Sequence, residues 1–127
     1  MFLFRTLSNS TQFLHQTSYQ LQQSTFNIHK KHLWSFLEEY KQRVNVPFLC
    51  NLRIDLSTEE LIEKLKWAGV DRINVGIEHG NEELRQKILK RGKMSNEHII
   101  EFGSWLRKNK IRLHTANITG IPGETLD

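Results

Sequence analysis

The stretch LKWAGVDRINVGIEHGNEELR, residues 65–85, decides the fold because it holds a helix end, a strand and the start of a second helix. Gly69 follows the last apolar helix positions and supplies a left-handed stop. Apolar and polar residues then alternate over 71–77, which predicts a strand. Asn81 is a residue type that caps helix N-termini, so a helix is expected over 82–90. The stretch therefore predicts a helix followed by one βα unit.

Helix and strand patterns alternate in the same way on both sides of this stretch. The predicted elements are a helix over 29–44, a strand over 47–55 (PFLCNLRID), a helix from the capping-box pattern Ser57–Glu60 to Gly69, the strand over 71–77, helices over 82–90 and 95–109, and a strand over 111–118. In the helix over 95–109 we expect Ile99, Ile100, Phe102 and Leu106 to be buried. Strands that alternate with helices predict an α/β fold with a parallel sheet and right-handed crossovers.

Composition argues against a nucleic-acid or membrane protein. The 127 residues carry a net charge of +4, but the first acidic residue is Glu38, so much of the excess lies in the acid-free start of the chain. The remainder is nearly balanced and alternates in sign, unlike a basic nucleic-acid-binding face. No run approaches 18 apolar residues, so no transmembrane helix is expected. We expect no nucleic-acid partner, no membrane and a cytoplasmic location.

Residues 1–26 differ in character from the rest of the chain. They are rich in Ser, Thr and Gln and contain Arg5 as their one basic residue. A mitochondrial transit peptide normally carries several arginines, and a secretory signal needs a continuous apolar run. We expect a poorly defined N-terminal segment over 1–26 and a βα domain over 27–127.

Polar residues follow the strands at their carboxyl ends, where ligands gather in both βα barrels and open α/β sheets. These residues are Arg53 and Asp55 after the first strand, Glu78 and His79 after the second, and Asn117 and Thr119 after the third. The sequence therefore nominates this edge of the sheet as the site.

Within that edge, Glu78 stands between Gly76 and Gly80, and glycine permits close approach of a ligand or of backbone. The carboxylate suits hydroxyl or amine donors, although a solvated turn explains the same pattern. His79 is more typical of a loop histidine than of a catalytic base. Arg53 requires a partner in a half-buried strand, either a ligand or Asp55.

Two further features are candidates for ligand contact. Arg91 offers a bidentate fork for a carboxylate, or simply a cation near a helix end. The loop Gly120–Glu124 contains a Pro-Gly turn whose backbone groups suit the edge of a planar base, and a generic strand-to-helix turn is the alternative. Cys50 is the single cysteine and is expected to be an inert buried thiol. No histidine spacing predicts a metal site.

Taken together, four segments resemble the core of the radical S-adenosylmethionine (SAM) superfamily, most closely the group that often carries a cobalamin-binding domain. They are PFLCNLRID (47–55), LKWAGVDRINVGIEHGNEELR (65–85), LKRG (89–92) and NITGIPGET (117–125). The resemblance implies a partial parallel βα (TIM-type) barrel, incomplete at both ends. It also implies SAM and a [4Fe–4S] cluster as cofactors, with cobalamin compatible with the parent protein. In the family, SAM and the cluster together generate a 5′-deoxyadenosyl radical.

Transferred by position, the resemblance implies that Glu78 contacts the ribose and methionyl region of SAM and that Arg91 pairs with its carboxylate. Gly120 to Glu124 would abut the adenine, and Arg53 would face the same cavity. The family's C-x-x-x-C-x-x-C cluster motif is absent, and Gln23 and Ser24 stand where an acidic pair is expected. We therefore expect this chain alone to be inactive, its substrate and catalytic residues being unknown.

The alternative is a non-catalytic scaffold or interaction module that keeps only the fold. Its partner would be the remainder of a barrel or another chain.

Overall fold

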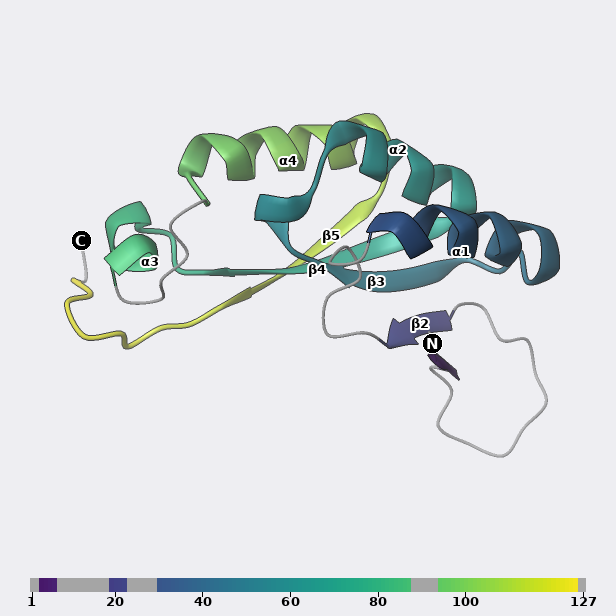
Figure 1. Ribbon diagram of the computed structural model, residues 1–127. Helices are drawn as coiled ribbons and strands as arrows, with labels where there is room; N and C mark the ends of the chain where they lie inside the picture. Colours follow the sequence, from purple (N-terminus) through teal and green to yellow (C-terminus); the bar gives the residue numbers. More distant parts are fainter. Residues whose placement is uncertain (1–2, 7–18, 23–29, 88–93, 126–127) are drawn as a thin grey trace.

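The computed structural model describes residues 3–6, 19–22, 30–87 and 94–125, which form a five-stranded sheet covered by helices on one face (Figure 1). The strands are β1 (Leu3–Thr6), β2 (Tyr19–Gln22), β3 (Phe48–Leu52), β4 (Val70–Glu78) and β5 (Arg112–Asn117). They follow the order β1-β2-β3-β4-β5, in which β2 to β5 are parallel and β1 is antiparallel to β2. The predicted α/β architecture with a parallel sheet is confirmed.

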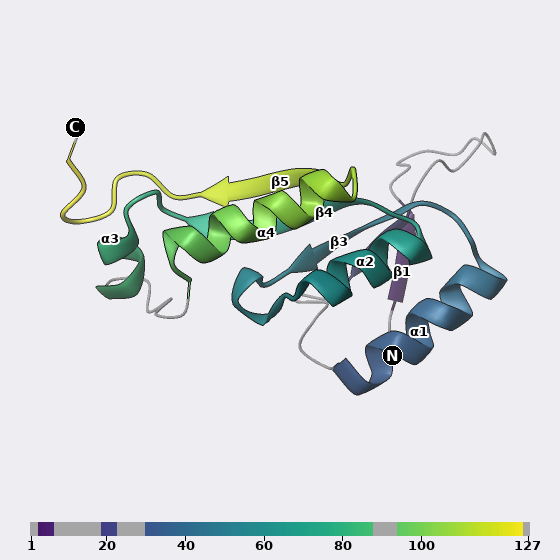
Figure 2. The same ribbon diagram turned by 90° about the horizontal axis from the view of Figure 1, so that it is seen from above.

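The connections between the parallel strands are helical. They are α1 (Lys30–Arg43), the short 3-10 turn η1 (Ile54–Leu56), α2 (Glu59–Ala68), α3 (Glu82–Lys87) and α4 (Asn96–Lys108). Figure 2 shows α1, α2 and α4 side by side over the sheet. The left-handed stop at Gly69 is confirmed by its φ of 107°, which an L-residue with a Cβ adopts only under strain.

The hydrophobic core fills the space between these helices and the sheet. Buried residues come from every layer: Leu33, Leu37 and Tyr40 of α1; Phe48, Cys50 and Leu52 of β3; Leu61, Ile62, Leu65 and Ala68 of α2; Val70, Ile73 and Val75 of β4; and Phe102 and Leu106 of α4. Alternate residues of β3 and β4 thus face the helices, and the residues between them face the opposite side of the sheet. This second face carries the polar side chains discussed below.

Four details differ from the sequence prediction. Ile100 is 72% exposed rather than buried, because it lines the open groove between α4 and β5, whereas Phe102 lies in the core. The strand expected over 47–55 ends at Leu52, and the chain turns into η1. Thr58 rather than Ser57 caps α2, its hydroxyl accepting a bond from the Leu61 N–H at 3.2 Å.

The fourth difference is that strands β1 and β2 were not predicted within residues 1–26. Each is four residues long, which is too short for a period-2 pattern to be distinguished in a Ser/Thr/Gln-rich segment. The last part of the helix expected over 82–90 lies outside the described residues, and α3 is described as far as Lys87.

Candidate functional site

A cavity of about 470 Å³ opens at the carboxyl ends of β3, β4 and β5, the edge that the sequence nominated. Its lining residues are Asn51, Leu52, Arg53, Ile54 and Asp55 from β3 and η1; Asn74, Val75, Gly76 and Glu78 from β4; Met94; and His114 and Ala116 from β5. Most of the polar members lie on the face of the sheet opposite the helices. Parallel strands present their carboxyl ends at one edge, so three separate segments of sequence converge here.

The floor of the cavity is a polar row across three strands. Asn51 pairs in register with Asn74, and Asn74 pairs with His114. The Asn74 amide Nδ2 donates to Asn51 Oδ1 at 3.0 Å. Asn74 Oδ1 is buried and has no hydrogen-bond partner in the part of the chain that the structure describes. A buried amide oxygen without a donor is destabilising by about 1–3 kcal/mol, so the floor favours a polar occupant.

Small residues above this floor leave the space. Gly76 pairs in register with Ala116, so β4 and β5 contribute almost no side-chain volume at this level. Glu78 closes over the gap, because a Cβ added at Gly76 would overlap its Oε1 atom. The backbone of Glu78 is itself unusual, with a φ of 74° that costs an L-residue roughly 1–2 kcal/mol. Such strain is typical of residues held in place for function.

Arg53 lines the cavity at the end of β3 together with Asp55. Its Nε and Nη2 atoms donate to the two carboxylate oxygens of Asp55 at 3.0 and 2.6 Å. The hydrogen bonds and charge of Asp55 raise the pKa of the Arg53 guanidinium. Of the two partners that the sequence left open for Arg53, the structure shows Asp55.

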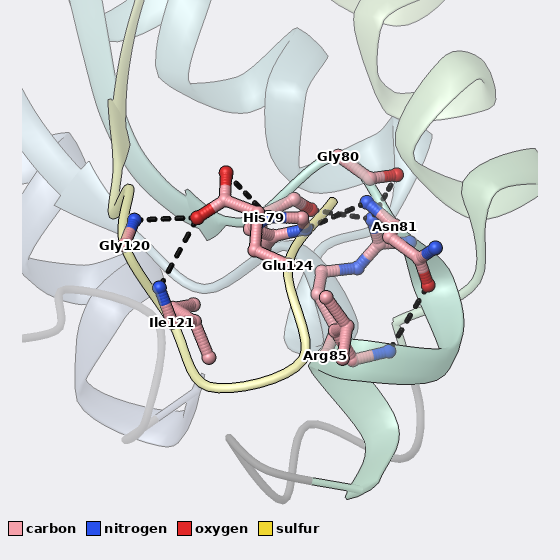
Figure 3. A network of polar contacts seen from close by, with 8 residues as sticks. His79, Gly80, Asn81, Arg85, Gly120, Ile121 and Glu124 are labelled. Atoms are coloured by element: carbon pink, nitrogen blue, oxygen red, sulfur yellow. Dashed lines mark hydrogen bonds and ion pairs between the residues drawn. The ribbon is translucent and has the colours of Figure 1, made fainter. Parts of the chain in front are cut away.

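The loop after β4 and the loop after β5 are joined by one carboxylate (Figure 3). Glu124 Oε1 lies 3.2 Å from His79 Nε2, and its Oε2 accepts from the backbone N–H groups of Gly120 at 2.5 Å and Ile121 at 3.1 Å. These contacts lower the pKa of Glu124, with the bond from Gly120 N–H contributing most and His79 next. Glu124 therefore holds its own loop in shape and ties it to His79.

Arg85 holds the loop after β4 in place, and this role was not predicted from the sequence. Its side chain is fully buried, and it donates to the carbonyl oxygens of His79 at 2.7 Å, Gly80 at 3.1 Å and Met94 at 3.2 Å, and to Asn96 Oδ1 at 2.5 Å. Nothing in the sequence EELRQK distinguishes Arg85 from a solvated helix residue. Its role arises because four acceptors from two segments, 79–80 and 94–96, converge on one position of α3.

The residues predicted for the site do not all line the cavity. Arg53 and Glu78 both line the cavity, whereas Gly120 and Glu124 belong to the adjoining loop and are not among the lining residues. Arg91 lies outside the described residues. The polar floor was not predicted, although the alternation of β4 carries the signal: if Ile73 and Val75 face the core, Asn74 faces the other way.

Metal-ligating groups are scarce in this region. Cys50 is fully buried in the core, and desolvation raises the pKa of its thiol, which opposes the thiolate that metals bind. No group of three or more His, Cys, Asp or Glu side chains suited to a metal ion occurs among the described residues. In the same part of the chain, no helix has the length and apolarity needed to cross a bilayer.

A known protein family matches most of this chain. The model of the radical SAM superfamily matches residues 19–127. TsrM from Kitasatospora setae, a radical S-adenosylmethionine methyltransferase solved with cobalamin and a [4Fe–4S] cluster bound, is 23% identical with a TM-score of 0.71. That match covers 87% of this chain and 23% of the TsrM chain.

A second TsrM structure, with tryptophan substrate and the SAM analogue aza-SAM bound, is 24% identical with a TM-score of 0.69 and covers 84% of this chain and 22% of the other. No curated protein matches. The chain therefore spans less than a quarter of the length of these two solved chains.

Proposed function

This chain belongs to the radical SAM superfamily, and we propose that its cavity at the carboxyl ends of β3, β4 and β5 binds S-adenosylmethionine. The observation that carries the proposal is a polar floor combined with two charged lining residues, Arg53 after β3 and Glu78 at the end of β4. SAM combines a carboxylate, an ammonium group, ribose hydroxyls and a planar base. A cavity with a guanidinium, a carboxylate and amide groups offers a complement to each of the polar ones.

Individual contacts follow from the chemistry and from the family resemblance. Glu78 would accept hydrogen bonds from the ribose or methionyl region, and Arg53 would face the methionyl charges across the cavity. The loop from Gly120 to Glu124 would lie against the adenine, with Glu124 keeping that loop in shape through its bonds to Gly120 and Ile121. Arg91 remains the proposed partner of the SAM carboxylate on sequence grounds.

A [4Fe–4S] cluster does not fit the residues of this chain. The family holds that cluster with three cysteines, and it supplies the electron that cleaves SAM to a 5′-deoxyadenosyl radical. The sequence contains Cys50 alone, and this thiol is buried among core side chains on β3. We therefore propose that this chain binds SAM without cleaving it. A cobalamin-binding domain in the same protein and a cytoplasmic location remain predictions.

Isothermal titration calorimetry with SAM tests the binding. We expect saturable heat for the wild-type chain and about tenfold weaker affinity for Glu78→Gln, which removes the charge and keeps the shape. Glu63→Gln on the exposed surface of α2 is the matched control and should bind like the wild type. Absence of heat for the wild-type chain, or equal affinity in Glu78→Gln, contradicts the proposal.

Anaerobic reconstitution with iron and sulfide tests the inactivity. We expect no stable absorption of a four-iron cluster and no 5′-deoxyadenosine after addition of SAM and a reductant. Formation of both by this polypeptide would overturn that part of the proposal.

A second candidate is an interaction module, and the outer edge of the sheet favours it. Among the described strands β5 pairs with β4 alone, and Leu113 and Ile118 are 43% and 46% exposed. Beside it lies a largely apolar groove between α4 and β5, lined by Ile100, Gly103, Ser104, Leu106, Arg107, Lys108, Ile111 and Leu113. An open strand edge pairs readily with another strand, from the rest of a barrel or from another chain. A sizing column distinguishes the cases: a dimer that Leu113→Lys converts to a monomer supports this role, and a wild-type monomer opposes it.

A further inference from the structure

Two tryptophans and a lysine form a distinct feature on the surface of α1 and α2, two helices that contribute no lining residue to the cavity. Lys64 Nζ lies 4.2 Å from the ring centroid of Trp67 on its own helix and 5.9 Å from that of Trp34 on α1. Both distances fall within the range of a cation–π interaction. Trp67 is nevertheless 47% exposed, so its ring remains accessible to a second molecule.

Carboxylates surround this aromatic pair. Trp34, Glu38, Glu60, Glu63, Lys64 and Trp67 line one open groove of about 540 Å³, which we call the aromatic–acidic groove. Glu38 Oε1 forms an ion pair with Lys64 Nζ at 3.2 Å, and its side chain is still 57% exposed. Glu63 Oε1 also lies 3.7 Å from Lys108 Nζ of α4. The three carboxylates that line the groove outnumber the ammonium groups of Lys64 and Lys108 by one, so the groove retains a negative charge.

We propose that the aromatic–acidic groove binds a lysine or arginine side chain presented by a basic segment of a partner protein. The groove has the two elements that recognise such a cation, an exposed indole face and carboxylates at its rim. The ammonium of Lys64 already occupies the position over the indole, which shows that this position accepts a cation. Lys64 therefore acts as a placeholder that the partner's cation displaces.

The energetics allow this exchange. A cation–π contact at an exposed site contributes about 0.5–1 kcal/mol, and an exposed ion pair contributes about as little. Lys64 is thus held weakly and can swing into water when another cation arrives. A guanidinium also stacks on an indole and takes a carboxylate in two-point contact, which an ammonium cannot do.

The test uses the full chain and the peptide Ala-Arg-Ala-Arg-Ala, followed by the indole N–H signals of the three tryptophans in NMR titrations at low ionic strength. We expect saturable shifts for Trp34 and Trp67 and none for Trp105, which belongs to α4. The peptide Ala-Glu-Ala-Glu-Ala should produce no saturable shift. Shifts that are equal for Trp105, or absent for all three indoles, overturn the proposal.

Two variants of α2 distinguish the local displacement of Lys64 from a general effect of its positive charge on peptide affinity. Lys64→Met removes the ammonium group from the indole face of Trp67. This change should raise the peptide affinity about two- to fivefold, the factor that corresponds to 0.5–1 kcal/mol. Lys66→Met removes the same charge from α2 outside the groove, and its affinity should change less than twofold. Trp67→Leu should weaken binding at least fivefold.

Equal gains in Lys64→Met and Lys66→Met would reduce the effect to long-range charge and contradict the proposal, as would weaker binding in Lys64→Met. SAM titrations of the same variants should match the wild type, because the groove and the cavity share no lining residue. The two proposals can therefore fail separately.

Discussion

β3 and β5 flank the same central strand in parallel register, yet one is buried and the other exposed. Phe48, Cys50 and Leu52 of β3 are each at most 4% exposed, whereas all but one of the β5 residues are exposed. The difference comes from their neighbours: β3 lies between two parallel strands beneath α1 and α2, while β5 has β4 on one side and α4 above it. The β3 side of the cavity therefore belongs to the core, whereas the β5 side lies at the outer edge of the described sheet.

The largest expected effect tests this asymmetry directly. Phe48→Ala removes a fully buried ring that packs against Tyr40, and should lower the free energy of unfolding by about 3–5 kcal/mol. Leu113→Ala on β5 should lower it by less than about 1 kcal/mol, because Leu113 is already half in water. Urea unfolding measures both, and similar losses for the two variants would contradict the difference between the strands.

The next effect concerns the anchor of the loop after β4. Arg85→Met keeps much of the side-chain volume but leaves three backbone carbonyls and Asn96 Oδ1 without their donor, at a cost of about 3 kcal/mol. Arg107→Met on exposed α4 is the control and should change stability by less than about 0.5 kcal/mol. A loss near that of the control would show that α3 is held without Arg85.

A smaller effect is expected from Gly76→Ala on β4, the strand between the two sides of the cavity. The added methyl group displaces the Glu78 carboxylate, which can swing aside because it is the end of a flexible side chain. Stability should therefore fall by about 1 kcal/mol or less, while the affinity for SAM drops several-fold. Calorimetry and urea unfolding of the same sample separate the two outcomes, and unchanged SAM affinity would argue against a role for Glu78.

The smallest effect is a pH dependence at the β5 side. Because the pKa of Glu124 is lowered in the folded chain, its contacts support the loop above that pKa and are lost as the pH falls through it. The amide signals of Gly120 and Ile121 should therefore shift with a midpoint below the ordinary range of a glutamate. Glu124→Gln should abolish that transition, and a midpoint in the ordinary range would show that the contacts do not persist in solution.

The sequence predicts the elements whose neighbours are close in the chain. The apolar stripe of α1, the stop at Gly69 and the alternation of β4 each record a local choice between core and solvent. Exposure of Ile100 and burial of Arg85 depend instead on where other segments lie, and no pattern within a single helix contains that information. For the same reason Arg53 and Glu78 were found as strand-end residues, whereas the contact between Asn51 and Asn74 required the register of two strands.

That register has a consequence for the shape of the cavity. Parallel strands lie about 4.8 Å apart, so a strand paired to the edge of β5 that no described strand occupies would place alternate side chains beside His114 and Ala116. The incoming residues would complete the lining on the side where it is now open to water. Whichever polypeptide occupies that edge would thereby co-determine which molecules the cavity admits, and two chains with the same Arg53 and Glu78 could differ in selectivity through their neighbour alone.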